Sequence, residues 1–154
     1  MSQVEDKLKE MGYDLPSPPA PMANYVPGFR TGNLVFLSGV GPRSVNGSVA
    51  SGKLGQEVTV EQGYAAARTC ALNLLANLKS IIGDLDGVAH IVKVLGMVNC
   101  SPDFGQQPQV INGCSDLLVD AFGERGRHAR SAVGMSALPN GIPVEIEMIV
   151  EVEG

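Results

Sequence analysis

The chain has 154 residues, a length typical of one domain. Apolar residues make up 44% and charged residues 18%, a balance that excludes disorder over most of the chain. The formal net charge is −5, aromatic residues are only 5%, and Trp is absent, which argues against the basic surfaces and stacking platforms of nucleic-acid-binding proteins. We therefore expect no nucleic-acid partner.

The metal-binding and redox-active residue types are few and are poorly spaced for a site. The three cysteines form no CxxC pair, and the two histidines form no HxxH or HExxH motif. We expect no metal. The N-terminus lacks the apolar core of a signal peptide, and no apolar run approaches the about 20 residues that span a bilayer. We expect a cytoplasmic protein with no membrane partner.

The N-terminal segment separates from the rest by its composition. Apolar residues recur at helical spacing before Gly12 and predict a short helix: Val4, Leu8 and Met11. Four prolines in residues 16–21 then predict an extended arm. We interpret residues 1–21 as an N-terminal helix and proline-rich arm, and residues 22–154 as a single domain. The arm has two interpretations, a packed cover for the domain edge, which we favour, and a polyproline ligand for a partner.

Residues 25–55 carry the signature of a hairpin followed by a loop. Two strand-like runs, Tyr25–Arg30 and Leu34–Ser38, flank the dipeptide Gly32-Asn33, which is typical of a tight turn. The Gly- and Ser-rich stretch 39–55 predicts a loop. It contains neither GxxxxGK[ST] nor a strand–GxGxxG–helix arrangement, so we do not interpret it as a phosphate-binding loop.

Two amphipathic helices are predicted in the middle of the chain. Thr59 and Gln62 form a capping-box pattern, and the apolar stripe that follows ends at Gly83. A second helix fits residues 107–122. Two cysteines lie on the apolar stripes of these helices, Cys70 and Cys114, and we interpret them as core residues.

The remaining segments predict strands. Residues 91–98 and 130–135 are rich in β-formers, and residues 144–153 alternate between apolar and mainly acidic positions. The order of strands and helices predicts an α+β fold, in which a mixed sheet has two helices packed on one face.

Arg130 and Glu145 are the residues most suited to chemistry. If their strands pair across the turn at 138–143, both side chains lie on one face of the sheet. A solvated ion pair is one interpretation. The other is a cleft at an oligomer interface, because Ile149 shares that face with Glu145 and an arginine fork binds carboxylates. We interpret His128, two residues before Arg130, as a surface residue.

Several motifs resemble the YjgF/RidA family, the reactive intermediate deaminases formerly called endoribonuclease L-PSP. The C-terminal signature comprises Arg130-Ser131-Ala132-Val133, Leu138-Pro139 and Val144-Glu145-Ile146-Glu147. The upstream elements are Tyr25-Val26-Pro27-Gly28 and Leu37-Ser38-Gly39. The resemblance covers about residues 20–154.

The resemblance implies a chorismate-mutase-like α+β fold and a homotrimer with clefts between subunits. It implies hydrolysis of enamines and imines to 2-oxo acids and ammonia, without a metal or organic cofactor. Arg130 would then bind the carboxylate of a small substrate, and Glu145 would position the attacking water. The family's substrate-contacting positions correspond here to Tyr25, Ser38, Gly39, Asn112 and Ala132.

The sequence also departs from the family pattern. Ala132 replaces a frequent cysteine, Val40 replaces a frequent glutamine, and an N-terminal extension precedes the common core. These differences indicate a divergent subgroup. They keep open an alternative function, a non-catalytic module that binds a small carboxylic acid on the same trimeric fold. Ribonuclease activity, described for some family members, is disfavoured by the acidic charge and the scarcity of histidine.

Overall fold

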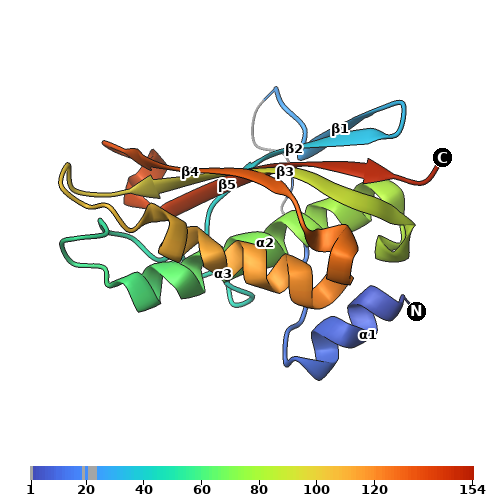
Figure 1. The fold of residues 1–154 in the computed structure, drawn as a ribbon, viewed down its shortest axis with the longest axis horizontal. Coiled ribbons are helices and arrows are strands. Elements are labelled where there is room, and N and C mark those ends of the chain that lie inside the picture. The colour runs from blue at the N-terminus through green and yellow to red at the C-terminus, as the bar shows by residue number, and fades with distance from the viewer. Residues whose placement is uncertain (1, 19, 21–23) are drawn as a thin grey trace.

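The fold is a five-stranded sheet with helices on one face (Figure 1). The computed structural model describes residues 2–18, 20 and 24–154. The strands are β1 (Gly28–Thr31), β2 (Leu34–Val40), β3 (Val88–Asn99), β4 (Ala129–Met135) and β5 (Val144–Val152). The α-helices are α1 (Gln3–Glu10), α2 (Val60–Ile82) and α3 (Gln107–Phe122). Three short 3-10 helices are η1 (Leu85–Gly87), η2 (Gly123–Gly126) and η3 (Pro139–Gly141).

The strand order is β1-β2-β5-β3-β4, and only β3 and β4 pair in parallel. This mixed sheet, with α2 and α3 packed on one face, confirms the predicted α+β architecture. The predicted hairpin is also confirmed, because Thr31 and Leu34 are paired across a two-residue turn. Gly32 has a φ of +58° in this turn, a conformation that glycine adopts at little cost.

Local sequence signals account for the ends of α2. The hydroxyl of Thr59 accepts from the backbone N–H of Gln62 at 3.1 Å, and the Gln62 side-chain oxygen accepts from the Thr59 N–H at 2.9 Å. This capping box satisfies two donors that the first turn of the helix leaves free. The helix ends at Gly83, whose φ of +88° breaks the helical path. Both helices bury their cysteines completely, as predicted for Cys70 and Cys114.

The two long helices approach each other closely where α3 carries Gly113. A Cβ at this position would lie 2.0 Å from the backbone oxygen of Tyr64 in α2. A glycine is therefore required for the contact between the helices. Gly96 of β3 has a similar role, because a Cβ there would lie 2.6 Å from the Ile111 side chain of α3. Together these contacts fix how α3 lies on the sheet.

The N-terminal helix is part of the packed core. Val4 and Leu8 are only 2% and 1% exposed. The carboxylate of Asp86 in η1 accepts hydrogen bonds from the backbone N–H groups of Gln3 and Val4 at 2.8 and 3.0 Å, which caps the helix from a part of the chain distant in sequence. The predicted proline arm follows, but Pro19 and residues 21–23 lie outside the described residues.

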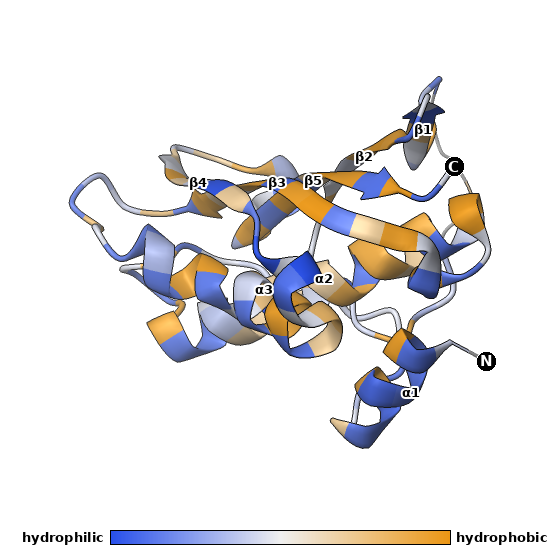
Figure 2. Cartoon of the chain, turned by 45° about the vertical axis from the view of Figure 1, so that its right-hand side comes forward, coloured by the Kyte–Doolittle hydropathy of each residue, from blue (hydrophilic) through white to orange (hydrophobic). Residues whose placement is uncertain are grey.

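The face of the sheet opposite the helices exposes apolar side chains beside the glutamates of β5. Figure 2 shows hydrophobic residues along β2 and β3, among them the residues of the buried face as well as those of the open face. Phe36 is 44% exposed and Val133 is 39% exposed on this face. Ile149 lies beside Phe36, and Met97 lies beside Val133. Monomeric proteins rarely leave such a surface in water.

Candidate functional site

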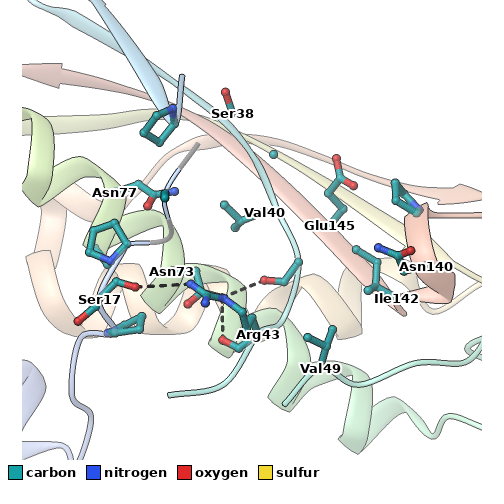
Figure 3. Close-up of a pocket in the computed structure, with 18 of the residues that line it drawn as sticks. Ser17, Ser38, Val40, Arg43, Val49, Asn73, Asn77, Asn140, Ile142 and Glu145 are labelled. Carbon is teal, nitrogen blue, oxygen red and sulfur yellow. Dashed lines mark hydrogen bonds between the residues drawn. The ribbon is translucent and has the colours of Figure 1, made fainter. Parts of the chain in front are cut away.

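A cavity of 530 Å³ lies at the edge of the sheet (Figure 3). It forms because β1 begins at Gly28, opposite Leu37, whereas β2 continues to Val40. The space beyond this edge is bounded by β2, the start of β5, the α2 helix and the described part of the proline arm. Cavities of this size hold small molecules in many proteins.

Glu145 enters this cavity from the second position of β5. Its carboxylate lies against the backbone of β2, where a Cβ at Gly39 would approach Oε2 to 2.5 Å. Burial raises the pKa of the Glu145 carboxyl, and the negative charge of Glu147 raises it further. A raised pKa makes the carboxylate a stronger base than an ordinary glutamate, which suits it to accept and return a proton.

Ser38 and Tyr25 form the rim of the same cavity. The Ser38 hydroxyl donates to the backbone oxygen of Val26 at 2.6 Å, and its N–H donates to the oxygen of Pro27 at 2.9 Å. These two bonds tie residues 25–27 to β2. Tyr25 is 59% exposed and lines the cavity. Four predicted site residues therefore meet here: Tyr25, Ser38, Gly39 and Glu145.

Arg130 belongs to a second group of residues, outside this cavity. It lies on β4, and its Nη1 donates to Asn112 Oδ1 at 2.9 Å and to Ser115 Oγ at 3.1 Å. Both acceptors come from α3. Ala132 follows on the same face of β4 and packs against the core. Three predicted site residues therefore form this second group: Asn112, Arg130 and Ala132.

The expectation that Arg130 and Glu145 share one face of the sheet is wrong. Their strands do not pair, because β3 lies between them. Val94 of β3 is paired with both Arg130 and Met148, whereas Met97 is paired with Glu145. Paired residues share a face, and positions three apart on a strand lie on opposite faces. Arg130 therefore faces the helices, and Glu145 faces the open side.

A chain of hydrogen bonds leads from Arg130 to His128. The His128 ring is 2.6 Å from the Gly126 carbonyl oxygen through Nδ1, and 2.8 Å from Ser115 Oγ through Nε2. A carbonyl only accepts, so we assign the proton of the neutral ring to Nδ1, and Nε2 then accepts from the Ser115 hydroxyl. Burial lowers the pKa of His128, and the charge of Arg130 lowers it further.

This arrangement corrects the interpretation of His128 as a surface residue. The ring is partly buried and orders the hydroxyl of Ser115, which in turn accepts from Arg130. Two signals in the sequence point to this group. His128 and Arg130 are two residues apart, the spacing of side chains on one face of an extended chain. Asn112 and Ser115 are three residues apart, the spacing of side chains on one face of a helix.

Comparisons with known proteins identify the family. The family model described as YjgF/chorismate mutase-like, putative endoribonuclease, matches residues 5–148. The chain belongs to this family. Among curated proteins, Protein TCP17 of Trypanosoma cruzi is similar to this YjgF family member, with 43% identity over 150 residues. The match covers 97% of this chain and 94% of TCP17.

Two solved structures are similar to this chain over nearly its whole length. Atu1372 from Agrobacterium tumefaciens, described as a protein of unknown function, is 42% identical with a TM-score of 0.91. The match covers 99% of this chain and 93% of Atu1372. A protein from Shewanella oneidensis, described as a putative endoribonuclease, is 32% identical with a TM-score of 0.93. That match covers 98% of this chain and all of the Shewanella chain, so it includes the N-terminal extension.

Among residues 2–18, 20 and 24–154, no group of three or more His, Cys, Asp or Glu side chains is placed to share a metal ion. No helix in that part of the chain has the length and apolar character needed to cross a membrane.

Proposed function

We propose that the protein hydrolyses enamine and imine intermediates to 2-oxo acids and ammonia, at sites that two subunits of a homotrimer share. The observation that carries this proposal is the division of the family's site residues into two groups on opposite faces of the sheet. One group offers a carboxyl in a cavity, and the other offers an arginine. The Glu145 group lacks the arginine that would bind a substrate carboxylate, and the Arg130 group lacks the carboxyl that would move a proton.

The open face of the sheet supports the assembly. Its exposed apolar side chains, which include Phe36 and Val133, need a covering surface. A second copy of the chain is the simplest cover, and closed symmetric rings are a common form of such assemblies. In a ring of three, the Arg130 group of one subunit would meet the Glu145 cavity of the next.

Arg130 is suited to anchor the substrate carboxylate. Asn112 and Ser115 hold only its Nη1 atom, so the other N–H groups of the guanidinium remain for a bidentate contact with a carboxylate. The contact fixes the imine carbon at one distance from the anchor. Such fixed positioning can supply much of the rate increase for an electrophile that is already activated.

Glu145 is suited to handle the protons. Its carboxylate accepts a proton from water while the water oxygen bonds to the carbon of the protonated imine, which gives a carbinolamine. The glutamic acid then returns the proton to nitrogen. The C–N bond breaks, the hydroxyl loses its proton to the departing ammonia as the carbonyl forms, and the products are a 2-oxo acid and an ammonium ion. Atoms and charges balance without another reactant.

Ammonia release from 2-iminobutanoate generated in situ tests the proposal. We expect the wild-type protein to accelerate release above the uncatalysed rate, and Arg130→Ala and Glu145→Gln to abolish the acceleration. Arg127→Ala is the matched control, because this arginine is exposed and lies only three residues from Arg130. Full acceleration by Arg130→Ala, with the fold intact, would remove the arginine from the mechanism.

Two substitutions favour a second candidate function, a carboxylic-acid-binding module without turnover. Ala132 and Val40 replace residues that are frequent at these positions in the family. A ligand that binds only the folded state raises its stability according to its concentration and Kd. This candidate predicts that 2-oxobutanoate raises the Tm of the wild-type protein but not of Arg130→Ala, while no imine is hydrolysed faster.

A further inference from the structure

One wall of the Glu145 cavity carries a cation that the proposed reaction does not use. Arg43 lies in the loop after β2 and lines the cavity. Within residues 2–18, 20 and 24–154, it has no carboxylate within 4.0 Å. Its only side-chain hydrogen bond there is a long one, from Nη2 to the backbone oxygen of Ser17 at 3.5 Å. Most of its donors are therefore available to a ligand.

The α2 helix holds the backbone that carries Arg43. The side-chain nitrogen of Asn73 donates to the backbone oxygens of Gly41 and Arg43, both at 2.9 Å. Asn73 is only 8% exposed, so these bonds are shielded from water. These hydrogen bonds fix the loop against the helix, and they hold the backbone of Arg43 in place at the cavity wall.

Asn77, one turn further along α2, is an unsatisfied polar group at the same wall. The residue is 4% exposed, and its Oδ1 is buried with no hydrogen-bond partner among the described residues. Figure 3 shows the side chain on the cavity side of α2, with the amide nitrogen toward Val40. Oδ1 is an acceptor and cannot bind an anion, but the side-chain Nδ2 donates to no described residue either, so its N–H groups are available to a ligand in the cavity.

We propose that Arg43 and Asn77 form a subsite for a second anionic group, which makes dicarboxylic 2-imino acids the preferred substrates. This inference rests on the proposed function. With the first carboxylate on Arg130 of a neighbouring subunit and the imine carbon beside Glu145 on the open side of the sheet, the substrate side chain would follow the cavity past the free edge of β2 at Val40 to reach Asn77. A guanidinium and an amide N–H at that point match a distal carboxylate.

The test compares two imines that differ in the distal carboxylate, 2-iminoglutarate and 2-iminobutanoate, each generated in situ. The readout is the ratio of their kcat/KM values. We expect the wild-type protein to favour 2-iminoglutarate at least tenfold, and Arg43→Gln and Asn77→Leu each to reduce this ratio at least tenfold. Arg30→Gln, which removes the same charge at an exposed position outside the cavity, should keep the wild-type ratio.

The outcomes separate this inference from the proposed function. Turnover of both imines with equal kcat/KM, or a ratio that Arg43→Gln leaves intact, would overturn the subsite while the deaminase function stands. If the protein hydrolyses neither imine faster than the uncatalysed rate, the proposed deaminase function fails. The subsite is then tested by the binding of 2-oxo acids, measured as a shift in Tm. The subsite then requires that 2-oxoglutarate raises the wild-type Tm more than 2-oxobutanoate does, with the difference lost in Arg43→Gln. Equal shifts would overturn it.

Discussion

Arg130 and Glu145 project from opposite faces of one sheet, with β3 between their strands. A substrate bound to the arginine of one subunit therefore cannot also lie against the glutamate of that subunit. The two residues can act on one molecule only if different copies supply them. The proposed chemistry and the proposed assembly are thus a single hypothesis.

Gly39 controls where the Glu145 carboxylate lies. A Cβ at position 39 would approach Oε2 to 2.5 Å, so Gly39→Ala should displace the carboxylate from β2. We expect kcat for imine hydrolysis to fall at least tenfold, because general base catalysis contributes about that much or more. Gly105→Ala is the control, since a Cβ there meets nothing within 4 Å. Unchanged kcat in a folded Gly39→Ala protein would contradict the placement of Glu145.

Glu147 tunes the acid–base behaviour of Glu145. Its negative charge raises the pKa of the Glu145 carboxyl, after burial as the larger cause. Removing the charge in Glu147→Gln lowers that pKa, so the base stays ionised in more acidic solution. The acidic limb of the kcat/KM profile should therefore move to lower pH. Glu151→Gln removes a charge further along the strand and should leave the limb in place. A limb that both variants shift equally would contradict a local effect.

His128 should make the stability depend on pH. Its folded-state pKa lies below the ordinary value of 6.5, because burial, Arg130 and His90 all disfavour the charged ring, against the Gly126 carbonyl. As the pH falls below 6.5, the unfolded chain takes up a proton that the folded chain does not. Stability is therefore present above this pH and is lost below it.

Thermal unfolding at pH 7.5 and pH 5.5 measures this effect. We expect the loss of Tm on acidification to be smaller in His128→Gln than in the wild-type protein. His90→Gln should change this loss less than His128→Gln does, because His90 lies outside the Ser115 hydrogen bonds and is the smallest of the influences on the pKa of His128. An identical loss in the wild-type and His128→Gln proteins would show that His128 is not held neutral.

Gly113 permits the contact between α2 and α3. Gly113→Ala would place a Cβ 2.0 Å from the Tyr64 backbone oxygen, and a helix backbone cannot yield as a flexible side chain can. We expect a loss of about 1–3 kcal/mol or more in the free energy of unfolding by urea. Gly87→Ala, where a Cβ meets nothing within 4 Å, should cost far less. Equal stabilities of the two variants would mean that the helices can move apart freely.

Local features of the fold were predictable because local chemistry determines them. The capping box at Thr59, the turn at Gly32 and the alternation of β5 each depend on a few neighbouring residues. The order of the strands was not predictable in this way. The alternation of side chains along a strand shows which of its residues share a face, but it does not show that β3 separates β4 from β5.

The same limit applies to the candidate site. The family motifs supplied seven positions, and the structure divides them into two groups according to topology. The sequence alone gives no reason to select Arg43 and Asn77, because no motif contains them. Only the packing of α2 beside β2 brings them to one cavity. The sequence also gives no reason to select Ser115, because its role is to accept a hydrogen bond from Arg130 on β4, which only the fold brings close.

Mixing of two inactive variants tests the shared site most directly. Arg130→Ala retains Glu145, and Glu145→Gln retains Arg130, so a site between one copy of each contains both residues. If the two variants are unfolded, mixed in equal amounts and refolded together, random assembly in a ring restores about a quarter of the sites. We expect imine hydrolysis at about a quarter of the wild-type rate from the mixture, and none from either variant refolded alone. A refolded mixture that remains inactive, despite demonstrated exchange of subunits, would contradict it.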